Sequence, residues 1–202
     1  MYKETIRDIS NRQVKKIWDE CALNPNFKMR DLIEKLGGNI YPDIDGRLAD
    51  YEEAEIFEAD GGDSFNIIYK PECVISDIKL KELEYKKDNC KNIIDKHLNN
   101  KNIRQAIAHE IGHLFLHMLK VENERIYFQG DYKKNIEDCS MIEWEAEEFA
   151  TILLMPENSF RAHFERFELI HDNENNIIDE LAKTYGVSTN YIIKRGRTLN
   201  LW

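Results

Sequence analysis

The feature that most constrains this chain is a segment with two histidines four residues apart. Between Gln105 and His117 the sequence is Gln-Ala-Ile-Ala-His-Glu-Ile-Gly-His-Leu-Phe-Leu-His. Apolar residues recur at three- and four-residue steps from 103 to 118, which predicts an amphipathic helix with one face in a core. On such a helix His109 and His113 share a face, with Cβ atoms about 5–6 Å apart. Both imidazoles can therefore bind one Zn²⁺.

Glu110 follows the first of these histidines directly. On an α-helix it points about 100° away from His109, since one turn takes about 3.6 residues. This direction places the carboxylate beside the metal and outside its set of ligands. A carboxylate beside a metal-activated water is suited to act as a general base. Glu110 is therefore the predicted catalytic residue.

The third ligand is expected from a second helix, predicted between residues 141 and 155. Glu143 shares a face of this helix with two alanines, and such small side chains would let another helix approach closely. Glu143 is therefore the preferred ligand, and Glu145 is the alternative. Glu147, one turn after Glu143, is expected to accept a hydrogen bond from a ligand imidazole.

Two further histidines are not expected to bind this metal. His117 continues the histidine stripe, but the ligands of one ion cannot span two full helical turns. We expect it to pack against the site or to support a ligand. His97 lies in a charged insert at about residues 73–102 and is expected to be solvated. None of the four cysteines has Cys-x-x-Cys spacing, so a zinc site closed by cysteines is not indicated.

Composition limits the classes of partner and the compartment. The net charge of −10 opposes non-specific binding to phosphate backbones and suits a neutral or basic partner. No apolar run approaches the roughly 20 residues that a membrane span needs. The N-terminus lacks the apolar core of a signal peptide, and the scattered cysteines suit a reducing compartment. The sequence therefore predicts a cytoplasmic protein without a membrane segment.

The remaining pattern predicts an α+β fold. Periodicity and breaking residues favour helices at 6–21 and 29–36, a strand at 39–41, a β-hairpin at 54–69 and a loop at 120–140. The stretch 177–195 has the pattern of a helix-turn-helix, with Gly186 in its turn. The few basic residues of this stretch would bind DNA weakly on a chain with a net negative charge. We therefore favour a role in packing or in substrate docking. We predict two domains, residues 1–160 and a helical extension at 161–202.

The segment 108–117, taken together with 143–156, resembles the ImmA/IrrE family of zinc metallopeptidases. The resemblance also takes in residues 60–69 and the two N-terminal helices, and so covers most of the chain. It implies a gluzincin-like α+β fold, in which a small mixed or antiparallel sheet packs against the zinc-binding helix. It also implies a specific site: His109, His113 and Glu143 as zinc ligands, with Glu110 as the catalytic acid and base.

The functional expectation from this resemblance is a cytoplasmic zinc endopeptidase that cleaves a transcriptional repressor of the helix-turn-helix type. The chain departs from the family pattern in its charged insert and at Glu147, where Asn or Asp is usual. We expect the small form of the family, without a sensor domain. The alternative is a DNA- or protein-binding regulator in which zinc only stabilises the fold, motivated by residues 177–195. Structural zinc sites normally have four protein ligands, which favours the enzyme.

Overall fold

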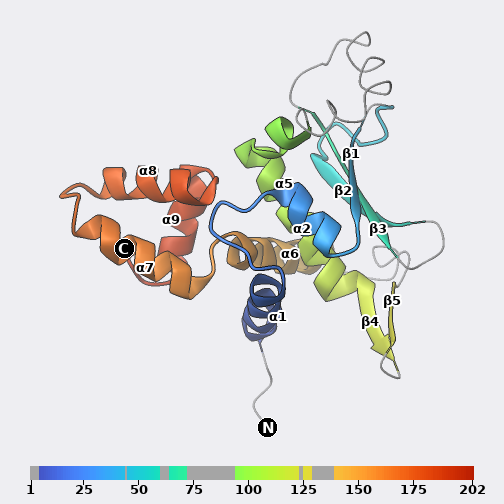
Figure 1. The fold of residues 1–202 in the computed structure, drawn as a ribbon, viewed down its shortest axis with the longest axis horizontal. Helices are drawn as coiled ribbons and strands as arrows, with labels where there is room; N and C mark the ends of the chain where they lie inside the picture. The colour runs from blue at the N-terminus through green and yellow to red at the C-terminus, as the bar shows by residue number, and fades with distance from the viewer. Residues whose placement is uncertain (1–4, 44, 60–63, 72–93, 123–124, 129–138) are drawn as a thin grey trace.

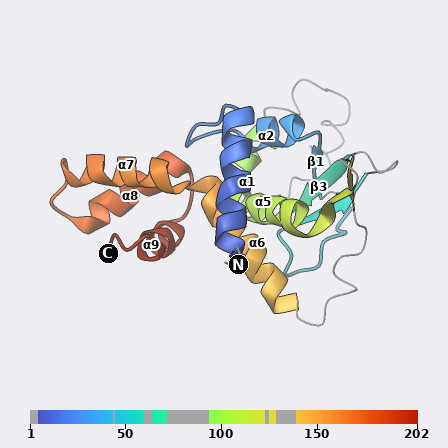
Figure 2. The same ribbon diagram turned by 90° about the horizontal axis from the view of Figure 1, so that it is seen from below.

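The computed structural model describes residues 5–43, 45–59, 64–71, 94–122, 125–128 and 139–202. These residues form a mixed α+β fold, which confirms the predicted fold class. Two helices, α5 and α6, cross at the centre of the molecule. A small sheet lies on one side of them and a group of three helices, α7, α8 and α9, on the other (Figures 1 and 2). The site helices therefore sit between the two outer parts.

Two N-terminal helices precede the sheet: α1 (Ile6–Glu20) and α2 (Met29–Lys35). Helix α1 packs on α6, and one side chain near each end of α1 bonds to α6. The Trp18 indole donates a hydrogen bond to the Leu153 carbonyl at 2.9 Å. The guanidinium of Arg7 contacts the Glu148 carboxylate at 2.7 Å. These contacts fix the position of α6, which carries the predicted third ligand.

The sheet has the strand order β1-β3-β2, with β1 at Asn39–Pro42, β2 at Ala54–Glu58 and β3 at Phe65–Tyr69. Strands β2 and β3 are antiparallel, as the predicted hairpin requires, whereas β1 runs parallel to β3. The turn of that hairpin, residues 60–63, lies outside the described residues. In the described sheet β2 is an edge strand, and α5 packs beside it (Figure 1).

The predicted metal helix is α5 (Lys101–His113), which continues into a five-residue π-helical turn, η1 (Leu114–Met118). It begins at Asn100, whose side chain accepts hydrogen bonds from two backbone N–H groups of the first turn. The apolar stripe found in the sequence is fully buried, because Ile103, Ile107 and Ile111 are each 0 % exposed. The stripe anchors α5 in the core and leaves the histidine face for the site.

Helix α6 (Cys139–Leu154) is followed by α7 (Glu157–Glu168), α8 (Glu174–Tyr185) and α9 (Thr189–Thr198). Gly186 ends α8 in the left-handed conformation, with φ 63°, which glycine adopts without a Cβ clash. The helix-turn-helix pattern at 177–195 is thus confirmed as local structure. The domain boundary at residue 160 falls inside α7 and stays a prediction.

Two local predictions were wrong. The start of the segment 120–140, expected to be a loop, belongs to the antiparallel strands β4 (Leu119–Glu122) and β5 (Arg125–Phe128). Each has only four residues, too few for an alternating pattern to stand out. His97 is half-buried, and its Nδ1 lies 3.4 Å from the Tyr69 hydroxyl of β3. The rest of the predicted loop, 129–138, and most of the charged insert, 72–93, lie outside the described residues.

Within the part of the chain that the structure describes, no helix combines the length and the apolar character needed to cross a bilayer.

Candidate metal centre

Helices α5 and α6 approach each other closely at Gly112 and Ala146. A Cβ atom added to Gly112 would lie 2.7 Å from the Ala146 carbonyl oxygen and 2.9 Å from its Cα. These are backbone atoms, so no side-chain rotation could relieve the contact. Gly112 lies just before His113 on α5, and Ala146 lies between Glu143 and Glu147 on α6. The absence of a side chain at Gly112 therefore lets α6 bring its carboxylates up to the histidines.

We expect Gly112→Ala to destabilise the protein by about 1–3 kcal/mol, the usual cost of overpacking a core. Helix propensity alone would favour alanine over glycine by about 1 kcal/mol. A lower free energy of unfolding in Gly112→Ala would therefore show that the added methyl group clashes with α6. Urea unfolding of the two proteins measures the difference in the free energy of unfolding. A variant as stable as the parent would mean that α5 and α6 do not pack this closely.

Three predicted ligand atoms converge at this crossing. His109 Nε2 lies 2.9 Å from Glu143 Oε2 and 3.0 Å from His113 Nε2, and the third separation, from His113 Nε2 to Glu143 Oε2, is 3.4 Å. Among the described residues these three form the group of His, Cys, Asp and Glu side chains placed to hold a metal ion. Glu145 lies elsewhere on α6, beside His117.

These separations are close to those of a zinc site: the one of 3.4 Å equals the ideal tetrahedral value, and the other two, 2.9 and 3.0 Å, are shorter. With Zn–N and Zn–O bonds of about 2.0–2.1 Å, tetrahedral geometry puts neighbouring ligand atoms about 3.3–3.4 Å apart. Without a metal, two imidazole nitrogens would face each other and a carboxylate, and at most one proton could be shared between the two rings. A cation accepts lone pairs from all three groups at once. The donor set therefore suits Zn²⁺, with His109 and His113 from α5 and Glu143 from α6.

Glu110 lies beside this group and is 6 % exposed. Its Oε2 accepts a hydrogen bond from the backbone N–H of Ile56, at 3.0 Å. The bond ties α5 to the edge strand β2 and fixes the orientation of the carboxylate. Glu110 also lines a cavity together with His109 and Glu143. The structure thus places Glu110 next to the ligand group without making it a member, as its position on the helix predicts.

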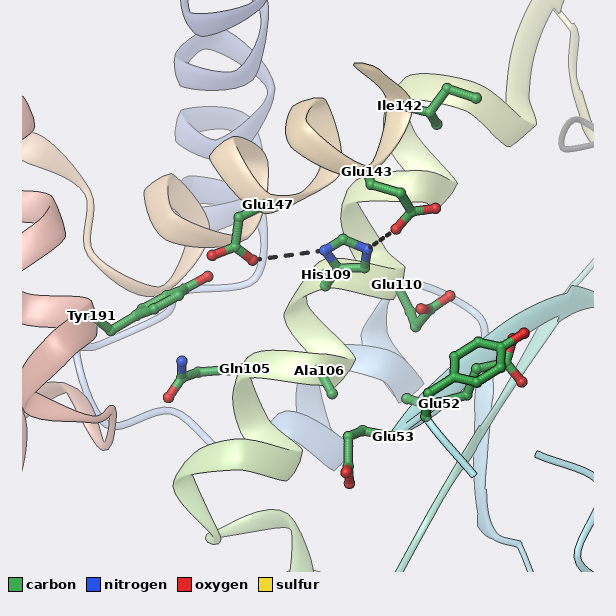
Figure 3. A pocket seen from close by; sticks show the side chains of 12 residues that line it. Glu52, Glu53, Gln105, Ala106, His109, Glu110, Ile142, Glu143, Glu147 and Tyr191 are labelled. Carbon is green, nitrogen blue, oxygen red and sulfur yellow. Dashed lines mark hydrogen bonds and ion pairs between the residues drawn. The ribbon is translucent and has the colours of Figure 1, made fainter. Parts of the chain in front are cut away.

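The Nδ1 face of His109 meets a second carboxylate. Glu147 Oε2 lies 3.7 Å from His109 Nδ1, which is longer than an ordinary hydrogen bond, and Glu147 Oε1 accepts one from Lys194 at 2.9 Å. Figure 3 shows Glu143 and Glu147 on opposite sides of the His109 ring. Burial alone would lower the pKa of His109, but Glu147, Glu110 and Glu143 outweigh it and raise that pKa. For Glu147, burial opposes ionisation, yet His109 and Lys194 lower its pKa overall.

His113 has a different neighbour on its Nδ1 side. Its Nδ1 lies 3.1 Å from Nδ1 of His117, and His117 Nε2 lies 2.9 Å from Glu145 Oε2. The His113 side chain is 1 % exposed and that of His117 is 8 % exposed. His117, predicted to pack against the site or support a ligand, is therefore in direct contact with one.

His109 and Glu143 of the ligand group line a cavity of about 530 Å³. Its walls come from four parts of the chain: residues 51–54 ahead of and within β2, and helices α5, α6 and α9. Five glutamates line it: Glu52, Glu53, Glu110, Glu143 and Glu147. Among the described residues this gives the cavity a strongly acidic lining.

Tyr191 is a lining residue that the sequence did not reveal. It lies on α9 and reaches toward Glu147 (Figure 3), and burial raises the pKa of its hydroxyl. It reaches the cavity because α9 contacts α6, for example through the ion pair of Lys194 with Glu147. The helix-turn-helix pattern that predicted α9 carried no signal for this role.

A His-Glu-x-x-His helix that packs against a second helix bearing a carboxylate is the arrangement of zinc metallopeptidases. Residues 93–196, more than half of the chain, match the model of peptidase family M78, described as the IrrE N-terminal-like domain. The chain belongs to this family, which confirms the resemblance found in the sequence. Membership supports a hydrolase that acts on protein. No curated protein matches the chain at a significant level.

Proposed function

We propose that this protein is a zinc-dependent endopeptidase in which His109, His113 and Glu143 bind the metal and Glu110 is the catalytic acid and base. The observation that carries the proposal is the convergence of three ligand atoms, 2.9–3.4 Å apart, beside a buried glutamate in an open cavity. Three protein ligands are typical of catalytic zinc, because the remaining position stays open for water or substrate.

Zinc held by these residues would supply a Lewis acid that polarises a peptide carbonyl and makes water nucleophilic near neutral pH. Glu110 takes the proton from the attacking water and returns it to the leaving amine. The Ile56 N–H donates a hydrogen bond to one oxygen of the Glu110 carboxylate and so fixes the position of that carboxylate. No covalent bond to the protein is required in this reaction.

We propose a basic regulatory protein, a repressor of the helix-turn-helix type, as the substrate. The support is electrostatic: five glutamates line the cavity, and the chain carries a net charge of −10. Complementary charge steers a partner and selects among partners more than it adds affinity. DNA-binding domains present clustered Lys and Arg side chains, which suit such a surface.

The edge of β2 is a suitable surface for an extended substrate. The backbone groups of Glu53 and Ala59 bond to the segment containing β3, so the even-numbered residues between them face the outer edge. The N–H of Ile56 is already paired with Glu110, which directs a substrate toward Ala54. Ala54 also lines the cavity. Addition of a strand here would lead a straight peptide past the ligand group.

The contacts of the basic side chains on α8 and α9 weigh against the alternative of a DNA-binding regulator. Lys194 is paired with Glu147, and Arg195 is 1 % exposed, with its Nε bonded to the Met155 carbonyl. Lys183 is paired with Glu180. A recognition helix would need such cations free to meet phosphates. The alternative predicts sequence-specific DNA retention that survives Glu110→Gln.

Removal of the metal tests the proposed function. The zinc-loaded protein would be incubated with a panel of intact helix-turn-helix repressors from the same cell, and the products read by mass spectrometry. We expect cleavage of one or a few repressors at defined bonds, loss of cleavage with EDTA, and recovery with Zn²⁺ but not Mg²⁺. Cleavage that persists after full removal of zinc would contradict the proposed chemistry. Absence of any cleavage by the loaded protein would contradict the substrate class.

A further inference from the structure

We propose that His117 and Glu145 form a hydrogen-bonded relay that fixes the tautomer and the ring orientation of His113. The proposal rests on the proposed function, since it concerns a ligand of the metal site. The two residues come from different elements: His117 from η1, directly after α5, and Glu145 from the N-terminal half of α6. Both would be positioning residues, because neither lies in the ligand group itself.

The relay is continuous from the ligand group to a carboxylate. His113 Nδ1 lies 3.1 Å from His117 Nδ1, and His117 Nε2 lies 2.9 Å from Glu145 Oε2. Both distances are those of ordinary or charge-assisted hydrogen bonds. The ring centroids of the two histidines are 5.2 Å apart and their planes are tilted by 49°. The rings therefore meet through their nitrogen atoms and are not stacked.

The chemistry of imidazole gives this relay a single direction. A histidine that binds a metal through Nε2 carries its proton on Nδ1, so His113 must donate there. His117 must then accept at its own Nδ1 and carry its proton on Nε2. That N–H points at Glu145, and an ionised carboxylate can only accept. The three groups thus form donor–acceptor pairs without conflict, which requires Nε2 of His113 to be the atom that faces the metal.

The side chains of the relay are mostly buried, which strengthens its hydrogen bonds relative to those of an exposed contact. The side chains of His113 and His117 are 1 % and 8 % exposed, and Glu145 is 23 % exposed. Water therefore has little access to compete for the two bonds between them. The contact lies in a π-helical turn, Leu114–Met118, an irregularity that is rare in α-helices and frequent at functional sites.

The other ligand histidine is held differently. Glu147 is 3.7 Å from His109 Nδ1 and shares its carboxylate with Lys194 at 2.9 Å. The carboxylate on this side is therefore drawn away from the ring by a lysine of α9. The contact at Nδ1 of His109 is longer, at 3.7 Å, than the hydrogen bond of 3.1 Å between His113 and His117. His109 is therefore held less tightly on this side than His113. We expect the His113 side to contribute more to the geometry of the site.

The test compares Glu145→Gln with Glu157→Gln in the full chain. Glu145→Gln removes the charge that ends the relay and keeps the size of the side chain. Glu157 forms a partly exposed ion pair with Arg161 on α7, so Glu157→Gln is a matched control away from the site. Zinc affinity would be measured by competition with a chromophoric chelator. Imidazole tautomers would be read from long-range ¹H–¹⁵N NMR spectra of the zinc-loaded proteins.

We expect Glu145→Gln to weaken zinc binding about 10–100-fold, the usual effect of losing an outer hydrogen-bond partner. We expect Glu157→Gln to bind zinc as the parent does. In the parent the proton of His117 should be on Nε2, and in Glu145→Gln this tautomer should no longer be the single form. His117→Gln, which breaks both bonds, should weaken binding at least as much, with thermal unfolding as the check on folding.

Two results would overturn the relay. If the parent binds zinc and Glu145→Gln binds it equally tightly with the His117 tautomer unchanged, Glu145 does not orient the ligand. If the parent carries the His117 proton on Nδ1, the direction of the hydrogen bonds is wrong. A parent chain that binds no zinc would instead refute the proposed metal site, and the relay with it.

Discussion

Replacing Glu110 with Gln is expected to lower the rate of peptide cleavage by about 10²–10⁴-fold, the usual contribution of a general acid and base. The amide keeps an oxygen that can accept the Ile56 N–H, so the contact between α5 and β2 should survive. The three ligand atoms come from His109, His113 and Glu143 and are untouched. Zinc content should therefore equal that of the parent while kcat falls. Both are measured on the same preparation, with Glu157→Gln as control.

Two outcomes of this substitution would contradict the assigned role. Cleavage at the parental rate would mean that another group moves the proton. Loss of zinc together with cleavage would mean that Glu110 supports the metal site, because its buried bond to β2 would then be needed to place α5.

Replacing Glu143 with Ala is expected to have the second largest effect, through loss of the metal. The Glu143 side chain is 50 % exposed, so its truncation leaves no cavity in the core. Exposed substitutions usually change the free energy of unfolding by no more than about 0.5 kcal/mol. Zinc affinity should nevertheless fall by more than the roughly 10–100-fold expected when an outer partner is lost. The site would keep only its two imidazoles.

The comparison with Glu145→Ala makes this result decisive. Both glutamates lie in the first half of α6, but Glu143 Oε2 is 2.9 Å from His109 and Glu145 Oε2 is 2.9 Å from His117. Zinc content after dialysis and affinity by chelator competition would rank the two variants. A greater loss in Glu145→Ala would reverse the assignment of the ligand. Equal retention by both would place the third ligand elsewhere.

Part of the site follows from local geometry and was predictable. An α-helix brings residues four apart onto one face, so His109 and His113 meet whatever the rest of the chain does. The helical turn of about 100° per residue placed Glu110 beside them and outside the ligand group. Helix α6 could also be predicted, together with the face that Glu143 shares with small residues. The structure brings those three ligand candidates together, and their role in binding zinc stays a prediction.

The rest depended on contacts between distant segments. His97 packs on Tyr69, 28 residues away, so its burial has no local signal. The pairing of Glu145 with His117 spans 28 residues, and that of Lys194 with Glu147 spans 47. In the last two cases the helices could be predicted, but the residues that meet between them could not. Which faces of the helices and strands meet is decided by the apolar area buried over the whole core. A single pair contact contributes too little to the free energy of unfolding to decide it.

The amino-acid sequence by itself therefore determined the class of fold, the family and the two histidines of the proposed ligand group, since these depend on helical periodicity and on spacing within one helix. It left Glu143 and Glu145 open as the third ligand, and the structure brings Glu143 to the histidines. Only the tertiary structure decided how the site is surrounded. The close crossing at Gly112 brings α6 to α5, β2 holds Glu110, and α9 supplies Tyr191 to the cavity. These arrangements arise because the apolar faces of all the elements must be buried together, and no segment carries that information alone.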